Sequence, residues 1–480
     1  MWRALSRRWG SLWRSSGAVN LAARIKENQI SSCHEAFVRA AEAALAAAEA
    51  PVTRLTKRVE GDYNHTVRGF VHRSGDYWRR DATVVGDLLS HHAARHVEEL
   101  RVALVQTYDA CLFADREVDR SQELCALDSL PSSETLRVLD LTRCDLARLA
   151  LAPVAFPRLA TLRLRLSTLD PTYLEALCDA APELATVHLE HVFFTVQDAA
   201  AAPPSVVVRL SFQTVTELVL ASCGAENSSW AVEVDAPRLR SFVYEGMIRH
   251  LLLRSPAPDI ARADLHLLSH RSYHYGKETT RTLFWQFLRN FSNARTLKLK
   301  VDNSLKEIAA LGKARGAELL PALCKVERLE LEGVHHPGSK TAAVAIASLL
   351  HCCPVLRDFT LKLSTVPHDS LKSDAYEQLF LGMKDRLDYL KSIHRFVRRS
   401  RRSETTISME DSCRGVRLHD APDIPGLRGR SFACLQSSLR RVTLQFRLDS
   451  SNTGCLGARL VKIFADNAMI LGKICCHPGF

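Results

Sequence analysis

The clearest pattern in this chain is a short alternation of apolar and polar residues that returns many times. In its regular form, apolar residues stand at the first, fourth and sixth positions, as Leu136, Leu139 and Leu141 do. An alternation with a period of two predicts a β-strand that buries one face and leaves the other polar. We therefore expect each copy of the pattern to form one short strand.

The pattern occurs ten times in series. Its copies, given by their three apolar residues, are Val97/Leu100/Val102, Leu136/Leu139/Leu141, Leu159/Leu162/Leu164, Leu184/Val187/Leu189, Val215/Leu218/Leu220, Leu239/Phe242/Tyr244, Ala294/Leu297/Leu299, Val326/Leu329/Leu331, Leu356/Phe359/Leu361 and Leu439/Val442/Leu444. The central residues follow one another at 23, 25, 31 and 24 residues from Leu139 to Phe242, and at 32 and 30 from Leu297 to Phe359. Chance would supply two or three copies, so the series indicates a repeat.

The first regular copy ends on Cys144 and so matches the L-x-x-L-x-L-x-x-C/N signature of a leucine-rich repeat. Spacers contain helical patterns, such as Asp170-Pro171 at a helix start and the apolar face of Phe284, Phe287 and Phe291. The predicted fold class is therefore α/β. It is a leucine-rich-repeat solenoid, with parallel strands on a concave face, helices and loops on the convex face, and a short helical segment at the N-terminus.

Five regions follow from the pattern. Residues 97–383 hold the regular solenoid, and residues 22–96 are assigned to a linker helix, at 33–50, and a first irregular repeat with a strand at 52–59 and a helix at 84–96. Residues 384–430 interrupt the pattern and are expected to be a basic flexible linker. Residues 431–480 form a last unit, with a strand at 439–448 and a helix at 458–468, while 471–480 lack the alternation of a closing strand.

The segment 1–21 has a different pattern. Its apolar residues Trp2, Leu5, Trp9, Leu12 and Trp13 recur every three or four positions, which predicts an apolar stripe on a short cationic helix. So much aromatic surface is expected to dock on something. Two possibilities are packing on the chain's own repeats and, because the segment is rich in Arg and Ser and its first acidic residue is Glu27, an import presequence.

A third possibility comes from a family resemblance at both ends of the chain. Residues 5–13, Leu-Ser-Arg-Arg-Trp-Gly-Ser-Leu-Trp, resemble the closing helix of an F-box. Cys434-Leu435, Leu439–Val442 and Ala458–Leu471 resemble the FBD domain. With the repeats between them, the chain is similar to plant F-box/leucine-rich-repeat/FBD proteins, with an F-box that is truncated at its N-terminus and an FBD end that diverges.

The resemblance implies a non-enzymatic function. In this family the F-box binds a Skp-type adaptor of a cullin-based ubiquitin ligase, and the repeats recognise a protein substrate. Carried over to this chain, Leu5, Trp9, Leu12 and Trp13 would contact the adaptor, and the chain would work in the cytoplasm, the nucleus or both. The substrate protein cannot be named from the sequence. An alternative is a truncated repeat scaffold that binds a protein without coupling to the ligase.

The strand pattern itself predicts a surface for the partner. Polar residues that alternate with the buried leucines would point away from the core and line the concave face. The candidates for partner binding are Arg137, Asp140, Arg163, Arg165, His188, Glu217, Lys298, Lys300, Glu330 and Lys362.

Charge adds one further alternative. The net charge is +11, of which residues 1–14 contribute +4 and residues 384–402 contribute +6. The run 395–402 could bind a nucleic acid or an anionic surface, and such binding would weaken steeply with salt. A nucleic-acid site would more often spread its basic residues over a folded face, so we do not expect nucleic acid as the partner.

The sequence shows few signs of catalytic or metal-binding chemistry. Motifs for phosphate loops, dinucleotides, serine hydrolases and zinc proteases are absent from the sequence, and we expect no enzyme, cofactor or metal. His92 and His96 stand four residues apart, but a third ligand at suitable spacing is missing. The longest apolar runs are shorter than a membrane span, and the fourteen cysteines are expected to be reduced.

Overall fold

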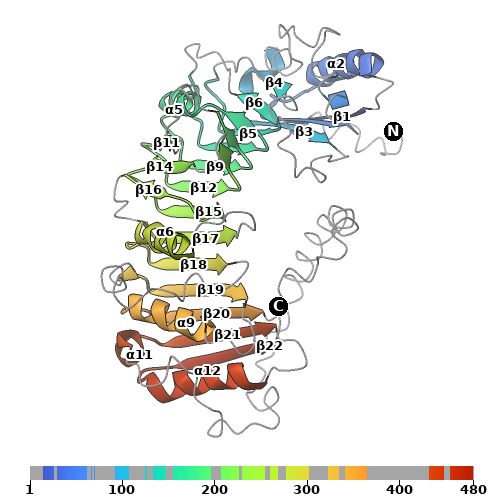
Figure 1. The fold of residues 1–480 in the computed structure, drawn as a ribbon. Helices are drawn as coiled ribbons and strands as arrows, with labels where there is room; N and C mark the ends of the chain where they lie inside the picture. The colour runs from blue at the N-terminus through green and yellow to red at the C-terminus, as the bar shows by residue number, and fades with distance from the viewer. Residues whose placement is uncertain are drawn as a thin grey trace. The chain divides into compact units, whose positions relative to one another are not determined.

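The protein was analysed as a computed structural model. It describes residues 15–25, 30–61, 66–67, 70, 92–106, 125–126, 133–146, 155–195, 207–225, 230–254, 260–268, 277–301, 323–334, 341–364, 432–447 and 454–478. The chain is an α/β protein of parallel strands with few helices, and it divides into two compact units (Figure 1). Unit 1 comprises residues 1–244 and 249–259, and unit 2 comprises residues 245–248 and 260–480.

The main sheet of unit 1 is built from strands that pair in the order of the sequence. Each strand lies parallel to the next, as the ten-fold pattern predicted. The strands are β1 (Ala18–Ile25), β2 (Arg54–Gly61), β3 (Glu99–Gln106), β5 (Val138–Thr142), β7 (Thr161–Arg165), β9 (Thr186–Glu190), β12 (Glu217–Ala221) and β15 (Ser241–Met247), and the two units divide within β15.

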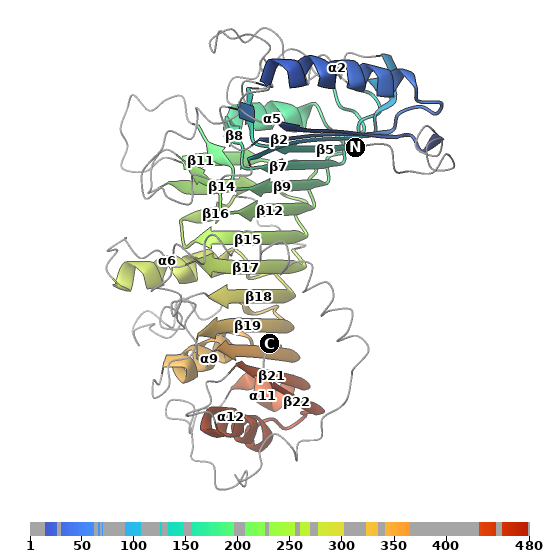
Figure 2. The same cartoon turned by 90° about the vertical axis from the view of Figure 1, so that its right-hand side faces the viewer.

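Two smaller parallel sheets accompany this main sheet. The first consists of two- and three-residue strands that follow the main strands, namely β4 (Cys125–Ala126), β6 (Cys144–Leu146), β8 (Thr168–Leu169), β10 (Phe193–Phe194) and β13 (Gly224–Ala225). The second contains β11 (Val207–Ser211), β14 (Ala231–Asp235) and β16 (Leu251–Leu253). Figure 2 shows β11, β14 and β16 at the ends of β9 and β12. The sequence pattern did not predict these strands.

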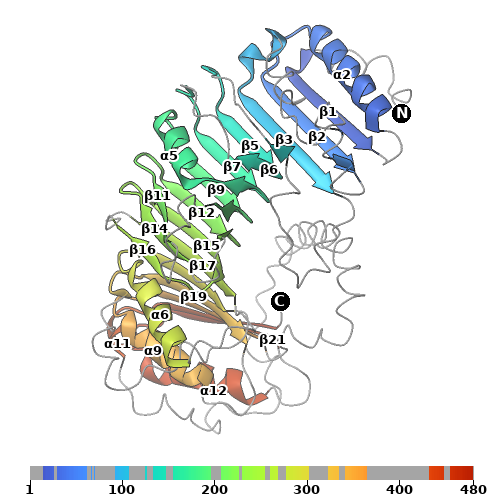
Figure 3. The same ribbon diagram turned by 45° about the horizontal axis from the view of Figure 1, so that its top comes forward.

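Helices of unit 1 lie along its strands. Helix α2 (Ile30–Ala46) runs beside β1 and β2 (Figure 3) and buries Phe37, Ala41 and Leu45. Helix α5 (Pro171–Asp179) begins as predicted, because the carboxylate of Asp170 accepts a hydrogen bond from the backbone N–H of Thr172. Of the helix expected at 84–96, the described part is the 3-10 helix η2 (His92–His96).

Unit 2 repeats the arrangement of parallel strands. Its strands pair in sequence order as β17 (Arg262–Leu268), β18 (Thr296–Val301), β19 (Arg328–Val334), β20 (Asp358–Ser364), β21 (Arg441–Arg447) and β22 (Lys473–Pro478). Its helices are α6 (Lys277–Arg289), α9 (Thr341–Cys352), α11 (Ala433–Ser437) and α12 (Gly454–Asn467). In Figures 1 and 2, α9, α11 and α12 lie on one side of β20, β21 and β22.

The strand register stacks the central apolar residues of the pattern on one another. In unit 1, Leu100 lies opposite Leu139, followed by Leu162, Val187 and Leu218, all of them buried. In unit 2 the corresponding stack is Ala263, Leu297, Leu329, Phe359, Val442 and Ile474. Burial of these apolar side chains on one face drives the strands together and sets their register.

One inward position of β2 departs from this pattern. Lys57 lies opposite Val102, in a row otherwise held by apolar residues, and it is only 2% exposed. Its Nζ stands 5.9 Å from the centre of the Phe37 ring, at the distance of a cation–π contact. The buried side of this strand therefore holds a lysine, which the alternation of apolar and polar residues does not predict.

The same pair of hydrogen bonds marks the entry of successive strands. At the start of each of these strands, two consecutive backbone N–H groups donate to the same carbonyl oxygen, which lies just before the neighbouring strand. The N–H groups of Arg137 and Val138 donate to Glu98, those of Ala160 and Thr161 donate to Arg137, and those of Ala185 and Thr186 donate to Ala160. Unit 2 shows it as well, with Glu327 and Arg328 donating to Arg295. Each strand therefore begins in the same way relative to its neighbour.

A second recurring feature follows four strands of unit 1. Arg143, Leu166, His191 and Ser222 come directly after β5, β7, β9 and β12, and each has a positive φ between 50° and 62°. Three of them use this turn to donate a backbone hydrogen bond across: Arg143 to Arg165, Leu166 to Glu190, and His191 to Ala221. A left-handed backbone conformation is unfavourable for residues other than glycine, so each of these four turns is strained. The same strained turn nevertheless follows all four strands.

Two segments differ from the prediction. Ala18–Leu21, assigned to the N-terminal helix, lie in β1, because Gly17 turns the backbone at φ 65° and Val19 and Leu21 alternate inward. Residues 473–478, which lack alternation, form β22 through backbone pairing with β21.

Another strand was missed altogether. β17 fills the long gap between Phe242 and Leu297, and its inward positions are Ala263, Leu265 and Leu267. The small Ala263 stands at the central position, which holds a large apolar residue in the ten copies, so the sequence of β17 does not match the pattern.

Candidate protein-binding face

The side of the strands opposite the buried leucines carries polar side chains in both units, and we call it the polar face. In unit 1 it comprises Arg54, Thr56, Arg58 and Glu60 of β2, Glu99 and Arg101 of β3, Val138, Asp140 and Thr142 of β5, Thr161, Arg163 and Arg165 of β7, Thr186, His188 and Glu190 of β9, and Glu217, Val219 and Ala221 of β12. In unit 2 its charged members include Asp264, Lys298, Lys300, Glu330, Glu332 and Lys362.

Most of the predicted partner-binding residues lie on this face. The register places Asp140 opposite Arg163, and Arg163 opposite His188, so three candidates from three strands form one row. Arg165 and Glu217 lie in the rows beside it. Arg137 is exposed but stands one residue before β5, and the residue of that strand on the polar face is Val138.

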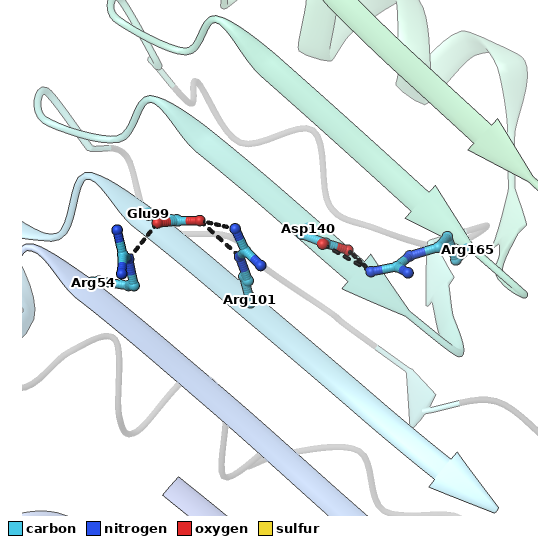
Figure 4. Close-up of polar contacts among 5 residues, drawn as sticks. All are labelled: Arg54, Glu99, Arg101, Asp140 and Arg165. Carbon is cyan, nitrogen blue, oxygen red and sulfur yellow. Dashed lines mark hydrogen bonds and ion pairs between the residues drawn. The ribbon is translucent and has the colours of Figure 1, made fainter. Parts of the chain in front are cut away.

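At β2 and β3, one carboxylate is held by two arginines (Figure 4). Nε of Arg54 lies 2.5 Å from Oε2 of Glu99, and Nε of Arg101 lies 2.7 Å from its Oε1. Burial tends to raise the pKa of Glu99, but hydrogen bonds and charge from Arg101 and Arg54 outweigh it and hold the pKa below its ordinary value. Glu99 is therefore ionised and fully occupied at neutral pH.

A second ion pair joins β5 to β7. Nη2 of Arg165 donates to both carboxylate oxygens of Asp140 at 2.9 Å (Figure 4). The two ends differ in environment, because the side chain of Asp140 is only 4% exposed whereas that of Arg165 is 45% exposed. A buried carboxylate needs such a partner, and the arginine still presents part of its guanidinium to solvent.

The centre of the face is less well paired. Nε of Arg163 is buried and has no hydrogen-bond partner among the residues that the structure describes. His188 lies next to it, and burial, followed by the charge of Arg163, lowers the pKa of its imidazole. Nε2 of His188 is 4.0 Å from Oε1 of Glu217, the outer limit of an ion pair.

On unit 2, lysines and carboxylates alternate from strand to strand. Oε1 of Glu330 lies 2.7 Å from Nζ of Lys362 and 3.5 Å from Nζ of Lys298, so one carboxylate links three strands. Burial tends to raise the pKa of Glu330, but Lys362 and Lys298 outweigh it and lower the pKa. In the next row, Nζ of Lys300 lies 3.7 Å from Oε1 of Glu332.

Several of these residues were not among the predicted candidates. Arg54, Glu99 and Arg101 complete the ion-pair cluster of unit 1, and Glu332 and Asp264 belong to the face of unit 2. Glu99 and Arg101 could have been found, since they alternate with Leu100 and Val102 in a recognised copy of the pattern. Arg54 could not, because nothing in the sequence says which carboxylate it meets.

The predicted adaptor-binding residues Leu5, Trp9, Leu12 and Trp13 lie outside the described residues, as does the basic linker 384–430. Within the described ranges, no group of three or more His, Cys, Asp or Glu side chains could hold a metal ion. In the same ranges, none of the helices is both long and apolar enough to cross a membrane.

The buried cysteine thiols Cys353 and Cys434 contribute to packing. Burial raises the pKa of Cys434 to about 11 and that of Cys353 well above its ordinary value. Sγ of Cys434, in α11, lies 3.5 Å from the carbonyl oxygen of Leu350, in α9, so the thiol helps to join two helices. Thiols held protonated in this way are poor nucleophiles.

Taken together, the described geometry offers charged hydrogen-bonding groups at fixed spacing along a row of strands. No family model matches this chain, and comparisons with curated proteins and with solved structures found no match.

Proposed function

We propose that this chain is a leucine-rich-repeat solenoid that recognises another protein through its polar face and has no catalytic function. The observation that carries the proposal is the common register of the strands. It buries one apolar residue of each copy over the next and so places charged residues of neighbouring strands side by side, as with Asp140, Arg163 and His188. Such a rigid, extended row suits the reading of a protein surface.

Two further observations support the repeat. The paired hydrogen bonds at the strand entries recur in both units, and the positive-φ turns recur at Arg143, Leu166, His191 and Ser222. Their spacing along the chain, 23, 25 and 31 residues, equals that of the buried central residues. Backbone geometry and side-chain pattern therefore have the same period, which is what stacked units of one kind would produce.

We further propose that the chain acts as a substrate-recognition subunit of a Skp–cullin–F-box ubiquitin ligase, in the cytoplasm or the nucleus. This step depends on the likeness of residues 5–13 to the closing helix of an F-box, and of the end of the chain to an FBD domain. Its partners would be a Skp-type adaptor and a protein substrate.

Adaptor binding is tested with the full chain and a purified plant Skp-type adaptor in a pull-down. The double variant Trp9→Ala/Trp13→Ala should lose binding, because these residues are predicted to bury in the adaptor. The variant Trp2→Ala is the control, since it removes a tryptophan of the same segment that is not among the predicted contacts. A folded wild-type chain that fails to bind the adaptor would leave the alternative, a repeat scaffold without ligase coupling.

Recognition by the polar face is tested separately. Peptides selected from a random library on the full chain should lose affinity when Lys300 and Lys362 are both replaced by Glu. The same peptides should bind the Arg209→Glu variant with unchanged affinity, because Arg209 lies on β11, outside the polar face. Equal loss in both variants would indicate a general charge effect and would refute recognition by this face.

Binding of nucleic acid through residues 395–402 remains a second candidate, supported only by the charge of that run. It requires affinity for a single-stranded oligonucleotide that falls steeply with salt and disappears when Arg398, Arg399, Arg401 and Arg402 become Gln.

A further inference from the structure

Arg163 stands in the middle of the polar face of unit 1. It is the central outward residue of β7, with Asp140 of β5 on one side and His188 of β9 on the other. Its side chain is half-buried and points to the face opposite the buried Leu162 and Leu164 of its own strand. A cation in this place is held by the sheet and cannot easily swing away.

Two carboxylates on the strands before β7 are already used by other arginines. Glu99 is bound by Arg54 and Arg101, and both oxygens of Asp140 are bound by Arg165. No ion pair or hydrogen bond of the Arg163 side chain is found among the described residues, and its Nε is buried without an acceptor. On β3, β5 and β7 the polar face thus has three arginines for two carboxylates.

Such a group is costly in the free protein. A buried N–H of a charged side chain that loses water without gaining an acceptor destabilises the fold, so these groups are rare and often mark a binding site. Burial, followed by the charge of Arg163, lowers the pKa of the adjacent His188, so the neutral imidazole neither neutralises Arg163 nor adds a second positive charge beside it near pH 7.

We propose that Arg163 is the anchor at which unit 1 binds a carboxylate of an acidic segment in the partner protein. This inference rests on the proposed function, which it deepens by stating the chemistry of the partner. The planar guanidinium matches a carboxylate in a two-point hydrogen bond, which an ammonium cannot make. One anion would satisfy the surplus charge of these three strands, whereas a nucleic acid typically requires several phosphate contacts.

The test uses peptides selected from a random library on the full wild-type chain. Selected peptides should be enriched in Asp and Glu, and their affinity is measured by fluorescence anisotropy against the wild type and three variants. Arg163→Gln removes the charge, Arg163→Lys keeps the charge without the planar fork, and Arg209→Gln is the matched control. Arg209 lies on β11, outside the polar face, and is paired with Glu233 of β14.

We expect affinity to fall by about tenfold or more in Arg163→Gln and by a smaller factor in Arg163→Lys, since a charged hydrogen bond contributes about that much. Arg209→Gln should stay within about twofold of the wild type, as expected for an exposed ion pair outside the polar face. Matched far-ultraviolet circular dichroism and melting temperatures establish that each variant is folded.

Three results would overturn the inference. Selected peptides without acidic enrichment that still depend on the polar face would leave the proposed function intact and exclude an acidic partner. An equal loss in Arg163→Gln and Arg209→Gln would mean general charge attraction. A single-stranded RNA that binds through Arg163 when acidic peptides do not would assign the anchor to phosphate. If no peptide binds at all, protein recognition itself fails.

Discussion

Asp140 and Arg165 form an ion pair along a diagonal of the sheet, although Asp140 lies directly opposite Arg163 in register. Nη2 of Arg165 reaches both oxygens of the carboxylate at 2.9 Å. Because this pair is made, Arg163 is left without a carboxylate of its own among the described residues. The choice of partner by one buried aspartate therefore decides which arginine of the face is available to bind.

Removal of the buried carboxylate should destabilise unit 1. Asp140→Ala leaves Arg165 without its partner and is expected to lower the free energy of unfolding by about 1 kcal/mol, the contribution of a hydrogen bond to a charged group discounted for the exposure of Arg165. Urea denaturation followed by circular dichroism measures the change. Glu190→Ala, at an exposed position of the same face, should change it by less than about 0.5 kcal/mol.

The positive-φ turns allow a stabilising substitution. Leu166 has φ 51° and is 42% exposed, so Leu166→Gly relieves the strain of a left-handed conformation and removes an exposed apolar side chain. We expect the free energy of unfolding to rise by up to about 1 kcal/mol, measured as a higher denaturant midpoint. The control Thr186→Gly, within β9, should destabilise, since glycine in a strand loses more chain entropy. If Leu166→Gly destabilises as much as Thr186→Gly, the strain argument fails.

Packing of α12 on the strands of unit 2 should be essential for that unit. The Phe464 ring, in α12, lies 5.8 Å from the Phe359 ring, in β20, and both are fully buried. Phe464→Ala is expected to cost about 3–5 kcal/mol through lost burial and the cavity left behind. Ile470→Ala, at an exposed position just beyond this helix, should change the melting temperature little. A small effect of Phe464→Ala in thermal unfolding would mean that α12 does not contribute to the core.

The Glu330 cluster predicts a loss of stability in acid. The folded-state pKa of Glu330 lies below its ordinary value of 4.5, so the ionised form is stabilised by folding. That contribution is complete above the unfolded pKa and disappears as the pH falls from about 4.5 through the folded pKa. The difference in unfolding free energy between the wild type and Glu330→Gln should therefore be constant near pH 7 and shrink toward pH 3. A difference that does not change with pH would exclude the ion pairs as its source.

His188 predicts a second pH dependence with its own window. Burial lowers its pKa below the ordinary 6.5, so the unfolded chain takes up a proton at a higher pH than the folded one. Stability should consequently fall as the pH drops through about 6.5. His188→Asn cannot take up this proton, so it should lose less stability than the wild type between pH 7.5 and 5.5 in urea denaturation. An identical slope for both proteins would show that His188 titrates alike in the two states.

The repeating apolar pattern was sufficient to predict the strands at its ten copies and much of the polar face. Copies such as Leu136/Leu139/Leu141 became buried parallel strands, and candidates such as Asp140 and Lys298 lie on the opposite face, because alternation along a strand is a local property. The pattern does not predict strands that are stabilised mainly by hydrogen bonds to an adjacent strand. β22 forms although its residues do not alternate well, and β17 forms around the small Ala263, since both are stabilised by backbone bonds to adjacent strands.

The sequence by itself determined which segments alternate apolar and polar residues and so form strands with one apolar and one polar face, because alternation depends only on the order of residues along the chain. Only the tertiary structure decided which charges meet. Arg54 and Glu99 are 45 residues apart, and Asp140 and Arg165 are 25 apart. Such pairs depend on strand register and side-chain reach, and these are set by the packing of whole strands upon one another.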